Sequence, residues 1–249
     1  MPAASSQPRA AVRFAGRLAK HGNALDECED AFSYSSSRFA VSDGATESSY
    51  SSVWAEILTR TFCAGDGHLE TPGAIGAWLE ASRQEWLVWE ADISARKDLP
   101  WFTRDKLRSG AFATFVGISF RESQWIAFGF GDACLFVVRS DALIDSFPLS
   151  SGAEFSTSPA LLSSRDDDLP IEESSLRAGS AAPGDRIYLA TDALAQWFFD
   201  DFEAGRKPWD ALDGISSSED LEIFVTEERA GHRMRNDDVA LLSVEILDD

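Results

Sequence analysis

Cysteine is scarce in this sequence of 249 residues: only Cys28, Cys63 and Cys134 are present, and no two of them have CxxC spacing. A disulfide framework or a zinc site needs more cysteines, or ligands that lie closer together. Three separated thiols are typical of a protein in a reducing cytosol. We therefore predict a cytoplasmic protein without a disulfide framework.

Positive charge is also scarce. Lys and Arg total 22 against 42 Asp and Glu, which gives a formal net charge of −20. So acidic a chain repels nucleic-acid phosphates and the anionic surface of a membrane leaflet. We expect neither nucleic acid nor a membrane as a partner. For most of these carboxylates, solubility alone is a sufficient explanation.

Long apolar runs are missing as well. No run approaches the about 20 residues that span a bilayer, and the start, MPAASSQPRAAVRF, lacks the apolar core of a signal peptide. Residues 1–9 are small and polar and contain proline, which predicts a disordered tail. Residues 10–249 show no repeat or internal boundary, so we predict one domain, and no feature indicates an oligomer rather than a monomer.

Short apolar runs and amphipathic stretches alternate in blocks along the chain. Strands are predicted over 11–17, 38–41, 111–120, 124–130, 133–139, 142–149, 185–190 and 238–246. Helices are predicted over 50–62, from Thr71–Pro72 onward, over 194–202 and over 219–230. The runs between 111 and 139 predict an antiparallel meander, and the block pattern indicates an α+β fold rather than a βαβ sheet.

Residues 150–180 have little periodicity and few large apolar side chains. Loops of this length inside a domain are usually functional or mobile. We predict a functional or mobile loop here, and a plain surface loop is the alternative.

Five acidic points share one setting, because each lies at the end of an apolar strand or in a turn between strands. They are Glu29–Asp30, Asp43, Asp132, Asp192 and Asp237. Carboxylates that converge at a sheet edge repel one another unless cations neutralise them. Oxygen ligands suit Mg²⁺ and Mn²⁺, and two such ions about 4 Å apart can bridge a water and clamp a phosphoryl group. Each aspartate alone is an ordinary turn residue, so only their shared setting indicates a metal centre.

Six segments carry a resemblance to a known family. In order, they are GNALDECEDAF, FAVSDGATES, SGAFATFVGI, IAFGFGDACLFVVR, GDRIYLATDALAQWF and NDDVALLSVEI. The ordered set resembles the PP2C-type metal-dependent Ser/Thr protein phosphatases, in particular divergent bacterial members, over residues 12–246. The resemblance implies a four-layer α-β-β-α sandwich of two antiparallel sheets flanked by helices. It also implies that residues 150–180 form a flap-like loop beside the site. It also implies hydrolysis of phosphoserine and phosphothreonine in proteins by a water or hydroxide that bridges the metal ions.

The resemblance also implies which residues bind metal directly. Asp43 corresponds to the carboxylate that bridges both ions, and the carbonyl of Gly44 to a ligand of one ion. Asp192 and Asp237 correspond to the remaining direct carboxylate ligands. Asp43, Asp192 and Asp237 are therefore the expected catalytic residues.

Other acidic residues take outer positions in the resemblance. Glu29 and Asp30 correspond to residues that act through metal-bound waters, and Asp238 to a residue behind the ligands. Asp132 lies where such enzymes hold a third, weaker ion, which Asp192 would share. The expected cofactors are two Mn²⁺ or Mg²⁺ ions, with this position for a third.

The chain departs from the family pattern at accessory positions. The segment before the ED pair has no arginine to hold a substrate phosphate, and its nearest basic residues are Lys20 and His21. Ala45 stands where eukaryotic members place a histidine that acts as a general acid, and its absence should reduce the rate. Thr191-Asp192-Ala193 replaces the more usual Ser-Asp-Gly.

The expected partner is a phosphorylated protein, and a cognate Ser/Thr kinase is a further expected partner. Two other functions stay open at this point. A pseudophosphatase would use the same fold as a regulatory binding module, although the chain keeps the whole set of metal aspartates. A phosphohydrolase would act on small phosphoesters.

Overall fold

Two five-stranded antiparallel sheets form the centre of the structure, a computed structural model that describes residues 9–46, 48, 50–65, 69–95, 107–165, 172 and 175–248. The first sheet contains, in spatial order, β1 (Arg9–Leu18), β12 (Val239–Leu247), β11 (Arg186–Ala190), β7 (Cys134–Arg139) and β8 (Ala142–Phe147). The second contains β10 (Leu176–Ser180), β6 (Gln124–Phe130), β5 (Phe115–Arg121), β3 (Arg38–Asp43) and β2 (Asp30–Tyr34). A small separate pair joins β4 (Phe112–Ala113) to β9 (Leu162–Ser163).

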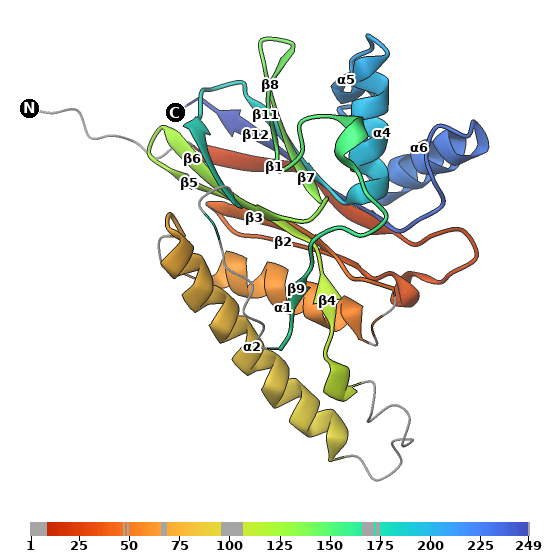
Figure 1. The fold of residues 1–249 in the computed structure, drawn as a ribbon. Coiled ribbons are helices and arrows are strands. Elements are labelled where there is room, and N and C mark those ends of the chain that lie inside the picture. The colour runs from red at the N-terminus through yellow and green to blue at the C-terminus, as the bar shows by residue number, and fades with distance from the viewer. Residues whose placement is uncertain are drawn as a thin grey trace, which may run out of the picture.

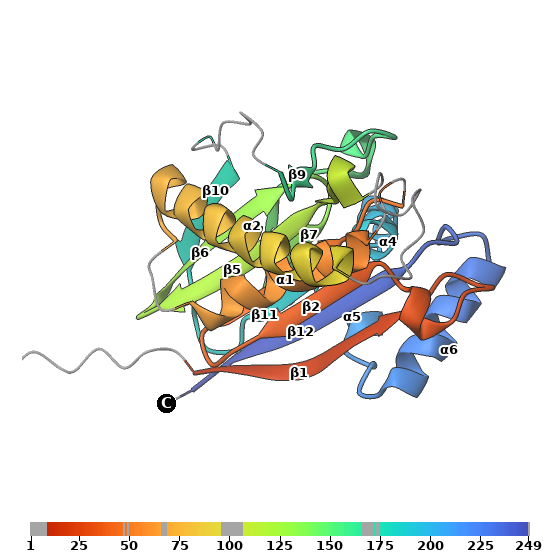
Figure 2. The same cartoon turned by 90° about the horizontal axis from the view of Figure 1, so that it is seen from below.

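Helices cover the outer faces of both sheets (Figures 1 and 2). The second sheet is covered by α1 (Ser51–Ala64) and α2 (Pro72–Ser94), and the first by α4 (Asp192–Glu203), α5 (Pro208–Leu212) and α6 (Ser218–Ala230). Short 3₁₀ turns, η1 (Leu25–Glu27) and η2 (Gly152–Glu154), lie in the connections. The predicted four-layer α-β-β-α sandwich is therefore confirmed.

Strand β7 shows how the sequence produces these layers. Phe136 and Val138 point into the core beneath α4, whereas Leu135 and Val137 point into the core between the two sheets. Successive side chains of a strand face opposite sides, so a strand between two cores is apolar on both. This explains why the run CLFVV has no polar alternation.

The predicted meander over 111–139 is wrong. β5 and β6 form a hairpin in the second sheet, but β7 and β8 form a hairpin in the first. The chain changes sheets at Gly131–Asp132, where Gly131 has φ 92°. A Cβ at Gly131 would lie 2.6 Å from the carbonyl oxygen of Ala160, so only glycine fits this crossing. Apolar runs identify strands but not the strands with which they pair. The cores that the two sheets face are built from the same apolar residue types.

Several predicted boundaries also differ from the structure. The predicted strand over 111–120 is divided between β4 and β5, and the helix expected over 194–202 begins at Asp192. The loop predicted over 150–180 contains β9 and β10, and β10 pairs with β6 at the edge of the second sheet. Residues 166–171, 173 and 174 of that loop lie outside the described residues.

The predicted N-terminal tail extends one residue too far into the chain. Arg9, assigned to the tail, is the first residue of β1, while residues 1–8 lie outside the described residues. The single domain over 10–249 stays a prediction.

Helix α2 begins as predicted, with Thr71 accepting a hydrogen bond from the Ala74 N–H at 3.2 Å and Pro72 in the first turn. Among the described helices, none has both the length and the apolarity to cross a membrane.

Phe136→Ala tests the core between the first sheet and its helices. The Phe136 ring stacks on Phe198 at 3.8 Å and meets Phe199 edge-on at 5.0 Å, fully buried. We expect the free energy of unfolding to fall by about 3–5 kcal/mol in urea titrations. The control, Ile144→Ala on β8, removes a side chain that is 47% exposed and should change it by less than about 1 kcal/mol. Equal losses in the two variants would contradict this account of the core.

Candidate metal centre

Three of the predicted carboxylates converge at one end of the sandwich. Asp43 ends β3, Asp132 lies in the crossing between the sheets, and Asp192 is the first residue of α4. One oxygen from each lies within 4.8 Å of the others. Three segments that are far apart in sequence thus supply one group of oxygen ligands, as the strand-end positions predict.

Asp30 and Asp237 lie around this group. Asp30 in β2 is directly opposite Asp43 in the register of the β2–β3 pair. Asp237 lies in the loop before β12, and its charge acts on Asp30, Asp43 and Asp132. The Asp237 side chain is 41% exposed, so the cluster is buried at Asp30 and opens to solvent at Asp237.

The Thr191 hydroxyl connects three segments at the cluster. It donates to Asp30 Oδ2 at 2.6 Å and accepts from the Ala240 N–H at 2.8 Å. Thr191 also precedes Asp192, so its position fixes the start of α4 beside β2 and β12. The other Asp30 oxygen, Oδ1, is buried and has no hydrogen-bond partner among the described residues.

Burial and mutual repulsion shift the pKa values of these carboxyls upward. Burial raises the pKa of Asp30 to about 7 against the opposing effect of the Thr191 hydrogen bond, and the Asp238 charge adds to the increase. The pKa of Asp43 lies well above its ordinary value, first through burial and then through the charges of Asp30, Asp132 and Asp237. Burial also raises the pKa of Asp132. The cluster therefore favours anything that brings positive charge among its oxygens.

The donor set fits hard divalent cations. All of the converging ligands are carboxylate oxygens, which Mg²⁺ and Mn²⁺ prefer, and Asp132 Oδ1 is a second buried oxygen without a partner among the described residues. Thiols do not contribute. Burial raises the pKa of the Cys28 and Cys63 thiols to about 12, so these side chains are poor ligands.

Glu29 and Gly44 lie at the edge of the cluster, outside the group of three. Glu29 Oε1 accepts from the Ser51 hydroxyl at 2.5 Å, and its Oε2 lies 3.8 Å from Lys20 Nζ. The Gly44 N–H donates to the Glu29 carbonyl at 3.2 Å. A Cβ at Gly44 would lie 2.7 Å from the backbone of Ser51, so glycine lets the loop pass close to α1. Metal ligation by the Gly44 carbonyl stays a prediction.

Asp238 holds the neighbouring backbone in place. Its Oδ1 accepts from the Lys20 N–H at 2.7 Å and its Oδ2 from the Glu29 N–H at 2.8 Å. From α6, Arg229 donates to the carbonyls of Asp237 and Ala19. These bonds join the loop before β12 to the segment between β1 and β2, which carries Glu29 and Asp30.

Sequence reasoning missed three residues with a direct role in this geometry: Thr191, Ser51 and Arg235. The side chain of Arg235 pairs with Asp192 and lies 3.8 Å from Asp237. Its position two residues before Asp237 is a signal in the sequence, whereas the family resemblance points only to the segment before the ED pair. Lys20, one of the two candidates there, instead contacts Glu29.

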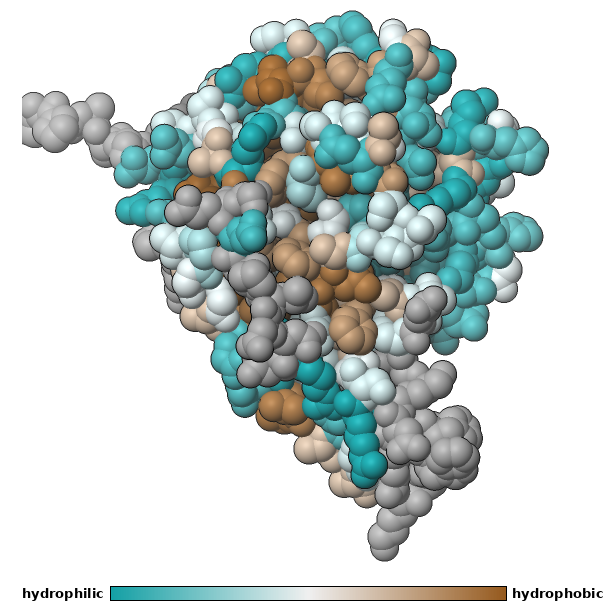
Figure 3. Space-filling model, viewed as in Figure 1, coloured by the Kyte–Doolittle hydropathy of each residue, from teal (hydrophilic) through white to brown (hydrophobic). Residues whose placement is uncertain are grey.

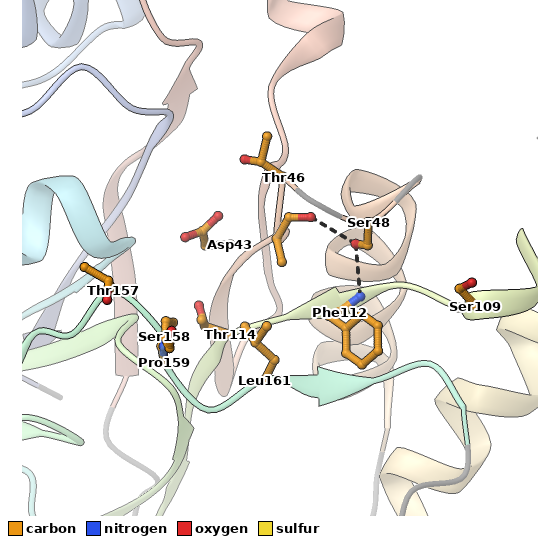
Figure 4. A pocket seen from close by; sticks show the side chains of 12 residues that line it. Asp43, Thr46, Ser48, Ser109, Phe112, Thr114, Thr157, Ser158, Pro159 and Leu161 are labelled. Carbon is orange, nitrogen blue, oxygen red and sulfur yellow. Dashed lines mark hydrogen bonds between the residues drawn. The ribbon is translucent and has the colours of Figure 1, made fainter. Parts of the chain in front are cut away.

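A cavity of about 580 Å³ opens beside Asp43 (Figure 4). Hydroxyl and apolar side chains line it together, among them Thr114, Thr157, Phe112 and Leu161. Figure 3 shows apolar residues gathered in the middle of the face that is turned to the viewer, over the region of β4 and β9. Residues 157–161 come from the predicted flap, so part of that segment does face the cluster.

Comparison with known proteins agrees with this geometry. The sequence profile described as Protein phosphatase 2C matches residues 19–227, and the chain belongs to this family. None of the curated proteins matches the chain significantly.

Solved phosphatase structures have the same fold at low sequence identity. The catalytic domain of the serine/threonine phosphatase PstP, in complex with two manganese ions, is 15% identical over 95% of this chain and 99% of that one, with a TM-score of 0.63. PstP/Ppp from Mycobacterium tuberculosis is 14% identical, over 96% and 100%, with a TM-score of 0.64. PppA from Pseudomonas aeruginosa is 18% identical, over 97% and 99%, with a TM-score of 0.64.

The raised pKa of Asp30 predicts how stability depends on pH when a chelator is present. Between the ordinary value of 3.8 and about 7, the folded chain holds a proton that the unfolded chain has released. Stability is therefore greatest below this window and falls as pH rises through it. Asp30→Asn does not titrate and can still accept from Thr191. We expect this variant to gain stability over the wild type between pH 4.5 and 8, measured by urea unfolding.

The control for this experiment is Asp26→Asn, which removes the same charge from an exposed position in η1. Its stability should follow the wild-type pH curve. If the Asp30→Asn curve also ran parallel to the wild type, repulsion at Asp30 would not limit stability.

Proposed function

We propose that the chain hydrolyses phosphoserine and phosphothreonine in proteins, using divalent ions held by this aspartate cluster. The observation that carries the proposal is the convergence of Asp43, Asp132 and Asp192 from three segments within 4.8 Å. Membership of the protein phosphatase 2C family supports it.

The residues have separate roles in the proposed site. Asp43, Asp192 and Asp237 hold Mn²⁺ or Mg²⁺, and Asp132 with Asp192 forms the position for a third ion. When bound, such ions lower the pKa of water and neutralise the charge that develops on a phosphoryl group. Asp30 and Glu29 lie around these ligands and would contact the ions through metal-bound waters. Ala45 provides no acid group, so no side chain at this position protonates the leaving serine or threonine.

Both alternative functions are less well supported. A pseudophosphatase would not need to retain the converging carboxylates of Asp43, Asp132 and Asp192, and burial raises the pKa of Asp43 and of Asp132. A small phosphoester would fill little of the 580 Å³ cavity beside Asp43, whereas a peptide segment around a phosphorylated residue can use its hydroxyl and apolar lining.

The proposed setting is cytoplasmic signalling, with a monomeric enzyme that opposes a Ser/Thr kinase. The three cysteines are free and buried, which is consistent with a reducing compartment. PppA, with the same fold, is described as a regulatory component of a secretion system in its organism, which supports a regulatory role.

Metal dependence is the direct test of the proposal. Dephosphorylation of a phosphothreonine peptide should require Mn²⁺ or Mg²⁺, should stop with chelator, and should not be restored by Zn²⁺, because the ligands are all oxygens. Asp43→Ala should lower the rate at least about a hundredfold. Asp26→Ala, an equal charge change on the exposed η1 turn, should retain wild-type turnover. Full activity after exhaustive metal removal would refute the proposal.

Leu161 tests whether the cavity beside Asp43 binds the substrate's peptide. Leu161→Ser should raise KM for a phosphothreonine peptide about tenfold or more, because the apolar contact is lost. The same variant should barely change KM for p-nitrophenyl phosphate, which has no peptide to place there. Leu87→Ser on α2 replaces a leucine that is 42% exposed and serves as the control. Equal effects on both substrates would show that Leu161 only supports the fold.

A further inference from the structure

Arg235 places a guanidinium directly on the proposed metal ligands. It lies in the loop between α6 and β12, pairs with Asp192 Oδ2 and lies 3.8 Å from Asp237 Oδ2. Its positive charge also acts on Asp132, where it opposes the increase in pKa that burial causes. Arg235 therefore faces three of the five clustered aspartates.

A guanidinium and a divalent ion cannot use the same oxygen of Asp192. Both are cations and need the same lone pairs, so an ion on Asp192 repels the guanidinium from that carboxylate. The Arg235 side chain is 39% exposed, and a cavity of about 440 Å³ adjoins it, lined also by Arg229, Met234 and Asn236. The side chain thus has room to turn without disturbing the core.

A phosphate dianion is the acceptor that suits a guanidinium at this place. Arginine presents planar, paired N–H donors that match two phosphate oxygens, and such charge-assisted bonds are strong. A phosphoester whose phosphate contacts ions on Asp192 and Asp237 comes within reach of the side chain that already contacts both.

Two basic side chains near the ED pair contact the pair itself. Lys20 Nζ lies against Glu29 Oε2, and an Arg17 N–H donates to the Asp30 carbonyl at 2.7 Å. The segment over 20–28 contains no arginine. Among the described ion pairs, Arg235 is the one that joins a guanidinium to Asp192 or Asp237.

We propose that Arg235 binds the phosphate of the substrate at the metal centre, a role that family resemblance would place before the ED pair. The inference rests on the proposed phosphatase function. It assigns substrate binding to the loop between α6 and β12, which also carries Asp237.

The test measures binding of inorganic phosphate to the Mn²⁺-loaded full chain by titration calorimetry. Arg235→Ala should weaken phosphate binding by at least about tenfold, the effect of losing a charge-assisted hydrogen bond. Arg235→Lys should recover part of it, because the charge remains but the paired donors do not. The matched control is Arg233→Ala, on the same loop, whose side chain pairs with Glu228 at 2.7 Å. It should bind phosphate like the wild type.

Mn²⁺ titration of each variant, without phosphate, separates the outcomes. Arg235→Ala should bind Mn²⁺ at least as tightly as the wild type, because a competing cation is gone. Three outcomes would each overturn the inference. The Arg235→Ala variant could bind phosphate like the wild type, or it could lose Mn²⁺ binding. The Arg233→Ala variant could lose phosphate binding to the same extent as Arg235→Ala. A wild-type chain that binds no Mn²⁺ would overturn the proposed function as well. A wild type that needs Mn²⁺ for turnover, with Arg235→Ala unaffected, would overturn only the inference.

Discussion

Repulsion among buried carboxylates is the constraint on which the architecture of this site depends. Asp30, Asp43 and Asp132 are removed from water, which raises the pKa of each, and the charges of Asp30 and Asp132 raise the pKa of Asp43 further. The surrounding polar contacts then have a common physical reason. Thr191 donates to Asp30, Arg235 pairs with Asp192, and Ser51 donates to Glu29, each bringing a donor to negative charge.

The sandwich brings these groups together because each sheet contributes strand ends to the same edge. Asp43 ends a strand of the second sheet, while Asp192 follows β11 and Asp237 precedes β12 in the first. The two apolar faces between the sheets fix their separation, since close-packed cores have little room to slide. Asp132, at the point where the chain passes from one sheet to the other, completes the group. The acidic cluster is thus a property of how the sheets stack, not of one local motif.

Much of the fold and of the cluster was predictable because its signals are local. Apolar runs of strand length located most strands, Thr71 and Pro72 located the start of α2, and the strand-end aspartates located the acidic cluster. Strand partners were not predictable from these runs. β6 and β7 are both apolar and separated by a short turn, yet they belong to different sheets. The crossing between them has φ 92° at Gly131 and leaves no room for a Cβ there, and neither feature can be read from an apolar run. Ser51 was missed because its contact partner Glu29 lies 22 residues away, which leaves no periodicity or spacing to detect.

The distribution of the aspartates over both sheets has a mechanical consequence. An ion held between Asp43 and Asp192 would act as a cross-link from one layer of the sandwich to the other. Any ligand that binds only the folded chain stabilises it by mass action, so ion concentration would set how firmly the layers are joined. A change in the packing between the sheets would in turn alter the spacing of the carboxylates. Stiffness of the sandwich and affinity for the ion are therefore coupled quantities, and neither can be tuned without the other.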